Sequence, residues 1–322
     1  MHCDTIMVLE QESTKGIKSN LAKNENHIDI KKLEMGNYLA QCFAMFVPLK
    51  NVSDPFETCL NMIDRFYLEL SKNSDKIAIA KNYDDIIKNQ KEHKISAILT
   101  VEEGGVIKKD LRNLRNLYRL GVRMITLTWN YENGIGFPNF TYIDGQKPDF
   151  KKPNTNDGLT NFGISVVEEM NRLGIIIDVS HLSDAGFYDV LKYSKAPFVA
   201  SHSNARSICN HVRNLTDDMI KKLADKGGVI GINFCSAFIN ENDDFATIED
   251  IIKHIDHIIK IGGINCVGLG TDFDGIDSNM ELKDASYLPL LEKALKEHGY
   301  TNEDIDKIMY QNVLRVLKNV LK

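Results

Sequence analysis

Two short apolar segments near the middle of the chain each end on a histidine. The sequence IIIDVSH (175–181) ends at His181, and APFVASH (196–202) ends at His202. The residues between them, AGFYDVLKYS (185–194), have the apolar spacing of an amphipathic helix, so the stretch predicts a βαβ unit. Chemistry in parallel α/β proteins sits at the carboxyl ends of the strands, and we therefore expect both imidazoles at a functional site.

Further histidines and carboxylates stand at the ends of other predicted strands. His2 and Asp4 are two residues apart, so on a strand they point to the same side. Glu102 ends the apolar run ISAILTVE on the face that we expect to point inward. Asp272 follows the predicted strand in CVGLGTDFDG (266–275). Parallel strands bring such residues to one edge of a sheet, so these side chains should converge.

Three imidazoles and three carboxylates form a hard-to-borderline ligand set. This set suits zinc, or else manganese or cobalt. One carboxylate shared by two metals would give a dinuclear site with the ions roughly 3.5–4 Å apart. Such a site deprotonates a bridging water near neutral pH and polarises a carbonyl group. The ligand set therefore predicts a hydrolase.

Each of these motifs also has a simpler interpretation. His2 and Asp4 begin at the second residue with no upstream strand to hold them, so a frayed terminus is the alternative, and a truncated start is left open. His254 and His257 lie three residues apart on a predicted helix and could also bind a metal. Because that helix should pack outside the barrel, we expect these two histidines at the surface.

Strands and helices alternate along the chain without a repeat, a low-complexity tract or a linker. This pattern predicts one α/β domain over residues 1–322, a single (β/α)8 TIM-type barrel of the kind found in metal-dependent hydrolases. The metal site would lie at the carboxyl ends of the strands. A doubly wound open sheet is the alternative. Residues 131–157, rich in Gly, Pro and Asn, should form a long loop over one end of the fold.

The composition excludes several classes of protein. The formal net charge of −6 and the lack of a basic block argue against a nucleic-acid partner. Neither a signal peptide nor an apolar run long enough to cross a bilayer is present, so we expect no membrane partner. The six cysteines are scattered without CxxC pairs, which indicates reduced thiols in a cytoplasmic protein.

The motifs taken together resemble the membrane (renal) dipeptidase family, the M19 zinc peptidases, in a soluble, prokaryote-like form. The likeness covers nearly the whole chain. Its most specific part is the combination DVSH…SHSNAR…RN…DFDG, and it includes HCDT, AQCFAMFV, VEEGG, LGVRMITLTWN, NRLGIIIDVSH, VRN, GGVIGINF, GLGTDFDG and NVLRV. The resemblance implies a (β/α)8 barrel with two zinc ions per chain.

The resemblance also implies the metal ligands, carried over by motif match. His2 and Asp4 would hold the first zinc ion, and His181 and His202 the second. Glu102, aligned without a gap to the VEGG of the family, would bridge both ions. This agrees with the inward position that the strand pattern predicts for Glu102.

The remaining site residues follow from the same match. Asp272 would take a proton from the bridging water and pass it to the leaving amine, so that Asp272 and Glu102 are the catalytic residues. Arg213 would bind the carboxylate of the substrate through two parallel hydrogen bonds; a surface ion pair is the alternative. Trp129 and Asn130, which close the predicted strand LTLTWN, would also contact the substrate.

Trp129 departs from the family pattern. The better-known mammalian members have histidine in this place, and that histidine helps to stabilise the developing oxyanion. Tryptophan can donate through its indole N–H but carries no charge. Either another group supplies the donor, or the metals act alone, or the substrate range has shifted. A packed aromatic side chain lining the mouth is the alternative role for Trp129.

Three functions are compatible with the sequence. The first is a dinuclear-zinc dipeptidase in which a metal-bridging hydroxide attacks the peptide bond of dipeptides, including L-Xaa-D-Xaa forms that the family tolerates. The second is another metal-dependent amide or ester hydrolase on this scaffold, a deacetylase or lactonase. The third is a non-catalytic binding homologue. Family members often dimerise, so a homodimer is left open.

Overall fold

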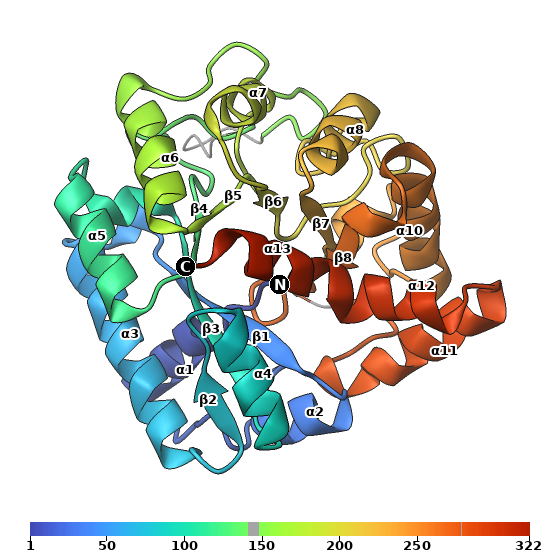
Figure 1. The fold of residues 1–322 in the computed structure, drawn as a ribbon, viewed down its shortest axis with the longest axis horizontal. Helices are drawn as coiled ribbons and strands as arrows, with labels where there is room; N and C mark the ends of the chain where they lie inside the picture. Colours follow the sequence, from blue (N-terminus) through green and yellow to red (C-terminus); the bar gives the residue numbers. More distant parts are fainter. Residues whose placement is uncertain (141–147, 278) are drawn as a thin grey trace.

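The centre of the computed structural model is a parallel β-sheet curled into a barrel (Figure 1), and the structure describes residues 1–140, 148–277 and 279–322. The hydrogen-bonded order is β1-β3-β4-β5-β6-β7-β8, with every pair parallel. The strands are β1 (Ala40–Phe46), β2 (Ile77–Ile79), β3 (Ile95–Glu102), β4 (Met124–Thr126), β5 (Ile176–Asp178), β6 (Val199–Ala200), β7 (Val229–Ile232) and β8 (Val267–Leu269). The predicted α/β barrel is confirmed.

The second strand does not stand in the barrel wall where a regular (β/α)8 order would put it. β1 pairs directly with β3 from Ser96 to Glu102, and β2 pairs with β3 at Ile95–Ala97. β1 already occupies one edge of β3, so β2 must use the other edge, on the side where β4 pairs farther along.

The first residues of the chain take the place between β8 and β1. The amide of Asp4 donates to the carbonyl of Phe273 at 3.0 Å, just past β8, and the amide of Ala44 in β1 donates to the carbonyl of Cys3 at 2.9 Å. His2 and Asp4 are both buried, with 1% and 2% of their surface exposed. The alternative of a frayed terminus is therefore wrong.

Helices surround the barrel (Figure 1). Most begin at the caps that the sequence indicates; Asp54, for example, accepts hydrogen bonds from the amides of Phe56 and Glu57. Their bounds are α1 (Thr5–Thr14), α2 (Ile30–Met35), α3 (Pro55–Lys72), α4 (Tyr83–Lys91), α5 (Leu111–Leu120), α6 (Asn161–Leu173), α7 (Asp184–Tyr193), α8 (Asp217–Asp225), α9 (Ser236–Ile239), α10 (Ile248–Gly262), α11 (Leu288–His298), α12 (Asn302–Asp306) and α13 (Asn312–Val320). The first four residues contain an isolated parallel bridge between Cys3 and Phe273 rather than a strand, because α1 begins at Thr5.

The two faces of β3 divide as the alternation of its residues predicts. Ala97, Leu99 and Val101 belong to the large apolar core beneath the outer helices. Ile98, on the opposite face, belongs to a separate apolar cluster inside the barrel. Glu102 is on the same face as Ile98, four residues farther along, so it points into the barrel near its carboxyl end.

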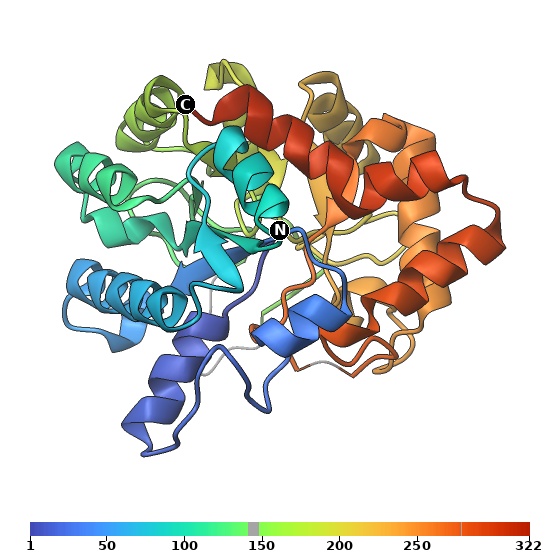
Figure 2. The same cartoon turned by 60° about the horizontal axis from the view of Figure 1, so that its bottom comes forward.

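Helix α13 closes the amino end of the barrel. It crosses the middle of the sheet in Figure 1, and Figure 2 shows α13 on one side of the sheet and α1 on the other. The apolar cluster that reaches inside the barrel contains residues of the strands, Ala80, Ile86 of α4 and three residues of α13. Its strand and α13 members are Cys42, Ile98, Met124, Ile176, Val199, Val229, Val316, Leu317 and Val320. Any site inside the barrel must therefore lie toward the carboxyl ends of the strands.

The long loop after β4 begins earlier than the sequence indicates. β4 ends at Thr126, so Trp129 and Asn130 lie in the loop rather than at the end of the strand. The loop returns to the barrel through isolated bridges, Gly136 with Leu159 and Pro138 with Leu182. Part of the predicted loop, residues 141–147, lies outside the described residues.

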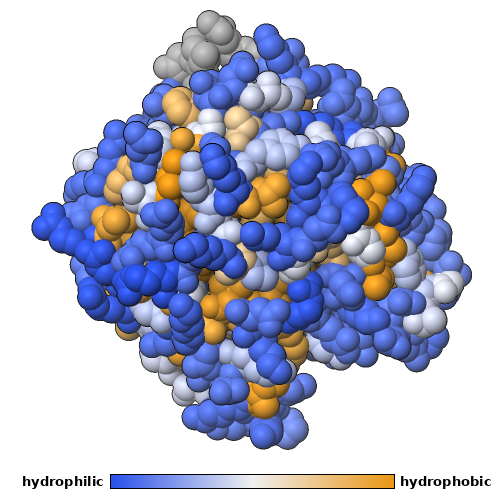
Figure 3. Space-filling model, turned by 45° about the horizontal axis from the view of Figure 1, so that its top comes forward, coloured by the Kyte–Doolittle hydropathy of each residue, from blue (hydrophilic) through white to orange (hydrophobic). Residues whose placement is uncertain are grey.

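The face of the molecule in Figure 3 is covered mostly by hydrophilic residues, with hydrophobic patches between them. None of the helices in the described ranges is long and apolar enough to cross a membrane.

Candidate metal and active site

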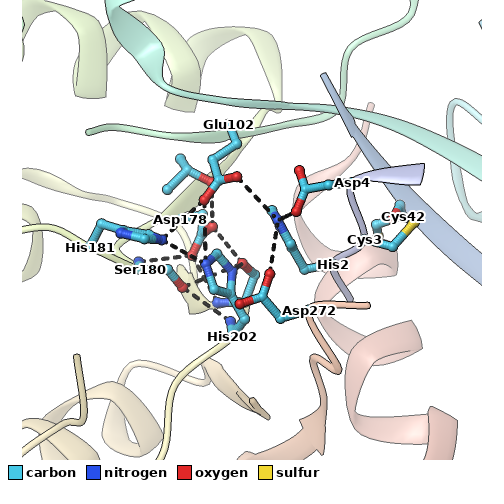
Figure 4. Close-up of polar contacts among 12 residues, drawn as sticks. His2, Cys3, Asp4, Cys42, Glu102, Asp178, Ser180, His181, His202 and Asp272 are labelled. Carbon is cyan, nitrogen blue, oxygen red and sulfur yellow. Dashed lines mark hydrogen bonds and ion pairs between the residues drawn. The ribbon is translucent and has the colours of Figure 1, made fainter. Parts of the chain in front are cut away.

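Six buried side chains from separate parts of the chain converge at the carboxyl end of the barrel, and the carboxylate of Glu102 lies among them (Figure 4). Glu102 Oε1 is 3.1 Å from His181 Nε2 and 3.5 Å from His202 Nε2. Glu102 Oε2 faces the other way and is 3.4 Å from His2 Nε2. The two oxygens of one carboxylate therefore face two different groups of ligands.

The second group contains the residues from the start and the end of the barrel. His2 Nε2 is 3.3 Å from Asp4 Oδ2 and 3.8 Å from Asp272 Oδ1. Three sets of side chains have ligand atoms within 4.8 Å of one another, and they share members: His2, His202 and Asp272; Glu102, His181 and His202; His2, Asp4 and Glu102. All six residues that the sequence analysis collected from strand ends are thus brought together.

Hydrogen bonds to neighbouring residues determine which ring nitrogen of His181 and of His202 is unprotonated. Ser201 Oγ donates its one proton to Asp178 Oδ2 at 2.6 Å, so its 2.7 Å contact with His202 Nδ1 requires that this nitrogen carries the hydrogen. His181 Nδ1 lies 2.9 Å from Asn130 Oδ1, an acceptor, and must also be protonated. The unprotonated Nε2 atoms of both rings therefore point into the site, only 3.0 Å apart.

The titration behaviour of the histidines differs on the two sides of Glu102. Burial, and then the positive charges of Arg213 and His2, hold the pKa of His181 well below its usual value. Burial and the charge of His2 do the same for the pKa of His202. Burial also disfavours protonation of His2, but the carboxylates of Glu102 and Asp4 outweigh it and raise the pKa of His2 well above normal.

The two central carboxylates are crowded and poorly compensated. Burial raises the pKa of Glu102 to about 8, against the opposing effect of His2, and the charge of Asp4 adds to the increase. Burial also raises the pKa of Asp272 to about 6, with His2 opposing and Asp4 contributing. A cluster of carboxylates with this shortage of positive charge has a strong affinity for a cation.

The donor atoms fit metal ions. Both ring nitrogens of His2 and Asp4 Oδ1 are buried without a hydrogen-bond partner anywhere in the described ranges. A buried polar atom without a partner is costly unless something else satisfies it. Two unprotonated imidazole nitrogens 3.0 Å apart likewise repel each other unless a cation lies between them and Glu102. Cations held by these donors would satisfy one ring nitrogen of His2 and the carboxylate of Asp4, and would remove the repulsion between the imidazoles of His181 and His202.

Asp272 is held by a residue that the sequence analysis missed. Asn233 is fully buried, and its Nδ2 donates to Asp272 Oδ2 at 2.9 Å, while Asp272 Oδ1 is left toward His2. Asn233 directly follows β7, as Asp272 follows β8, so the same signal of a polar residue after an apolar strand could have found it. Asp178 and Ser201 carry that signal too.

Arg213 lies beside the cluster with one part of its guanidinium unused. Nη2 donates to the carbonyl of His202 at 3.1 Å, and Nη1 is 3.5 Å from Ser203 Oγ. Nε is buried and has no hydrogen-bond partner within the described part of the chain. Only 3% of the residue is exposed, and burial lowers its pKa. A carboxylate brought from outside could satisfy this guanidinium, whereas the alternative of a surface ion pair is wrong.

Comparison with known proteins identifies the family. A family model described as membrane dipeptidase (peptidase family M19) matches residues 1–322. The chain belongs to this family. It is accordingly a metallo-dipeptidase, a hydrolase of peptide bonds, and this confirms the resemblance and the enzyme class that the sequence predicts.

Individual relatives agree with the family match. An uncharacterized dipeptidase of Schizosaccharomyces pombe is 38% identical over 307 residues, which are 91% of this chain and 72% of that protein. The structure of the metallo peptidase dipeptidase AC, assigned to M19, covers 99% of this chain and 97% of its own, with TM-score 0.88 and 26% identity. The structure of a metallo peptidase of Rhodobacter sphaeroides, liganded with a phosphinate mimic of the dipeptide L-Ala-D-Ala, covers 99% of this chain and 97% of its own, with TM-score 0.87 and 25% identity.

In this dipeptidase, aromatic side chains line one side of the mouth. The ring of Trp129 lies 5.0 Å from Phe46, 5.2 Å from Tyr131 and 6.0 Å from His181, measured between ring centroids. Phe46 ends β1 and Trp129 follows β4, whereas Arg213 belongs to the loop after β6. The aromatic side chains and the guanidinium therefore come from the ends of different strands.

The two histidines of α10 do not take part in this site. His254 Nδ1 accepts from the amide of Ala205 at 3.1 Å, and its Nε2 is 2.9 Å from the carbonyl of Ile239. His257 Nε2 pairs with Asp217 at 2.7 Å. The expectation of a surface position is wrong for His254, which is fully buried and joins α10 to two neighbouring segments.

Proposed function

We propose that this chain is a dinuclear-zinc dipeptidase whose substrates include L-Xaa-D-Xaa dipeptides. The observation that carries the proposal is the position of Glu102, with one carboxylate oxygen toward His181 and His202 and the other toward His2. A single bridging carboxylate between two ligand groups is typical of dinuclear hydrolytic sites. The phosphinate mimic of L-Ala-D-Ala in the Rhodobacter sphaeroides relative supports the substrate class.

The residues that would hold the two zinc ions follow from the two groups. His2 and Asp4 would bind one ion, His181 and His202 the other, and Glu102 both. Bound zinc supplies Lewis acidity that lowers the pKa of water and polarises a carbonyl group. Ser201 and Asn130 keep the Nδ1 hydrogens in place, so that His202 and His181 present Nε2 to the metal.

Asp272 is the residue best placed to move a proton. Its Oδ2 is held by Asn233 and its Oδ1 points toward His2. One carboxylate oxygen fixed by a neutral amide leaves the other oxygen available at the edge of the ligand cluster, where it can accept a proton and then release it. We assign to Asp272 the proton that leaves the attacking water and is delivered to the amine of the departing residue.

Arg213 would bind the free carboxylate at the C-terminus of the dipeptide. Its unpartnered Nε and its Nη atoms offer the planar pair of donors that a carboxylate accepts. A buried guanidinium favours a substrate that brings its own negative charge, and it disfavours neutral amides and lactones. This separates a dipeptidase from a deacetylase or lactonase on the same scaffold.

Trp129, with Phe46 and Tyr131, would contact the part of the dipeptide that is distant from Arg213, namely its N-terminal residue. Three neighbouring aromatic rings favour an apolar side chain there. The oxyanion role of the histidine found in mammalian members would then pass to the metals. Substrate contact by Asn130 stays a prediction, because the structure shows its Oδ1 against His181.

The six free cysteines, five of them buried, support a reducing cytoplasmic compartment. Dimerisation stays a prediction.

Kinetics on a panel of L-Xaa-L-Xaa and L-Xaa-D-Xaa dipeptides, compared with the matching dipeptide amides and N-acetyl amines, tests the proposed function. We expect turnover of the free dipeptides that disappears on chelation and returns with zinc, and little turnover of the amides. In Arg213→Lys the KM for free dipeptides should increase far more than the KM for amides. Efficient hydrolysis of the amides that does not depend on Arg213 would contradict the dipeptidase assignment and favour the second class of hydrolase.

A further inference from the structure

The carboxylate of Glu103, next to the bridging Glu102, is fully buried and has no role in the function described so far. It accepts hydrogen bonds from the amide of Gly105 at 2.7 Å, from the amide of Trp129 at 2.9 Å and from Asn133 Nδ2. None of these three donors carries a charge. Within the described ranges its hydrogen-bond donors are thus all neutral, and a buried carboxylate with neutral donors is an expensive feature whose presence needs a reason.

The backbone conformation at position 103 adds a second energetic cost to the presence of glutamate. Glu103 has φ of 84°, in the left-handed region that favours glycine. Two glycines follow it, and each allows a close approach to the loop after β4: a Cβ on Gly104 would lie 2.8 Å from the carbonyl oxygen of Leu127, and one on Gly105 would lie 2.8 Å from Asn133 Cβ. A third glycine would suit the turn better than glutamate, so the side chain itself must matter.

Glu103 acts on the segment that carries the aromatic and amide groups of the mouth. It binds the backbone of Trp129 at one end of this segment and the side chain of Asn133 at the other. Asn133 Nδ2 also donates to the carbonyl of Leu127 at 2.8 Å, which closes residues 127–133 into a compact loop. Asn130, inside this loop, contacts His181.

We propose that Glu103 is a positioning residue: it ties the loop 127–133 to the end of β3, so that Asn130 orients His181 toward the metal and Trp129 lies against the same imidazole. The bridging carboxylate and the loop that orients a second ligand are then fixed to each other through adjacent residues, Glu102 and Glu103. The reading of His181 as a metal ligand rests on the proposed function, whereas the effect on Trp129 does not.

Trp129 is the single tryptophan of the chain, so fluorescence excited selectively at tryptophan, and not at the tyrosines, reports on this loop alone. We would measure the emission maximum and the acrylamide quenching constant of metal-free wild type, Glu103→Gln and Glu103→Gly. The Gly variant relaxes the backbone but removes the carboxylate, and the Gln variant keeps the shape but places an NH2 group against at least one donor. We expect a shift of emission and a quenching constant increased two-fold or more in both variants.

The matched control is Glu69→Gln. Glu69 is equally buried, in α3 on the outside of the barrel, and also accepts a backbone hydrogen bond, from the amide of Leu21 at 2.8 Å. It should lose stability as the Glu103 variants do, while its Trp129 fluorescence stays that of wild type. This separates an effect on the loop from a general loss of stability.

Zinc binding by chelator competition gives the second readout. Loss of an outer partner of a metal-binding histidine typically weakens metal affinity by about 10–100-fold. We expect this loss for one of the two ions in Glu103→Gln, Glu103→Gly and Asn130→Ala, with the other ion and the Glu69→Gln control unaffected. If one Glu103 variant does not fold, the other one decides.

Wild-type fluorescence and quenching in a folded Glu103 variant would overturn the proposal, whatever its activity. Altered fluorescence with both zinc affinities unchanged would overturn the link from the loop to His181. Failure of the proposed function looks different: wild type would then bind fewer than two zinc ions or hydrolyse no dipeptide, and the fluorescence comparison in metal-free protein would still decide whether Glu103 holds the loop.

Discussion

The two ends of the barrel are equally buried but chemically opposite. At the amino end, the inward side chains of the strands, such as Ile98 and Met124, pack with α13 into an apolar cluster. A few residues farther along the same strands, the inward groups are carboxylates and imidazoles, such as Glu102 and His202, with 3% and 0% of their surface exposed. Burial alone therefore does not distinguish the apolar core of this enzyme from its candidate active site.

This difference shows that the amino end of the barrel stabilises the fold, whereas the carboxyl end costs stability. Each large apolar side chain buried at the amino end contributes about 1.5–3 kcal/mol. At the carboxyl end, Glu103, His181 and Asp272 all have positive φ, which costs on the order of 1–3 kcal/mol at each such residue when the side chain is not glycine. The apolar packing at the amino end and under α13 therefore offsets the cost of the positive φ values and buried charges at the carboxyl end.

The largest effect should come from Asp272→Asn. Loss of the carboxylate removes the proton acceptor, and kcat on a dipeptide should fall by roughly 10²–10⁴-fold. Because one negative charge is removed from a crowded cluster, the metal-free protein should unfold at the same or a higher denaturant concentration than wild type. Steady-state kinetics measure kcat, and urea unfolding measures the stability of the metal-free protein. An unchanged kcat would exclude Asp272 from the mechanism.

Ile98→Ala, at the amino end of the barrel, should lower stability and leave activity nearly unchanged. Truncation leaves a cavity under α13 and should lower the free energy of unfolding by about 2–5 kcal/mol. The zinc content and the kcat of the folded fraction should stay within two-fold of wild type, a margin that is roughly 0.4 kcal/mol. A large decrease in kcat at full zinc occupancy would show that the two ends are not independent.

Zinc should stabilise the protein only through its carboxyl end. With free zinc at about 100–1,000 times the dissociation constant, the gain for each site is about 2.7–4.1 kcal/mol. Thermal unfolding with zinc and with chelator should show this gain in wild type and in Ile98→Ala. In His181→Ala the stabilisation by zinc should be smaller by the contribution of one ion. If zinc stabilised this variant as much as wild type, His181 would be excluded as a ligand.

The smallest expected effect is on the pH dependence of stability and concerns His254, a buried histidine of α10 that belongs to neither end of the barrel. Burial lowers the pKa of His254 to about 4, below the unfolded value of about 6.5. The unfolded chain therefore binds the proton first, so stability is lost as the pH falls through this window, by about 1 kcal/mol between about pH 6.5 and 5.5. The pH slope of urea unfolding should be shallower in His254→Gln, and an identical slope would contradict this.

The convergence of the six candidate ligands could be predicted because it depends on local features of the sequence. Glu102 and Asp272 follow apolar strands, and alternation places Glu102 on the inner face, so their convergence could be predicted without coordinates. The direct pairing of β1 with β3 and the hydrogen bonds that hold His2 and Asp4 between β8 and β1 could not, because they join residues far apart in the chain.

The contacts around the ligands were likewise beyond the sequence. The hydroxyl of Ser201 matters because it lies between Asp178 and His202, and Glu103 matters because it contacts Trp129 from another loop. Trp129 and Asn130 were expected at the end of a strand, but β4 is shorter than its apolar run. Hydrogen bonds of this kind depend on distances between loops, which composition and spacing do not contain.

The most direct test of the account is a crystal structure of zinc-loaded protein with anomalous diffraction measured at the zinc edge. We predict two peaks at the carboxyl end of the barrel, roughly 3.5–4 Å apart, with Glu102 bound to both. One peak should contact His2 and Asp4, and the other His181 and His202. A single peak, or two peaks that do not share Glu102, would contradict the dinuclear centre on which the proposed function depends.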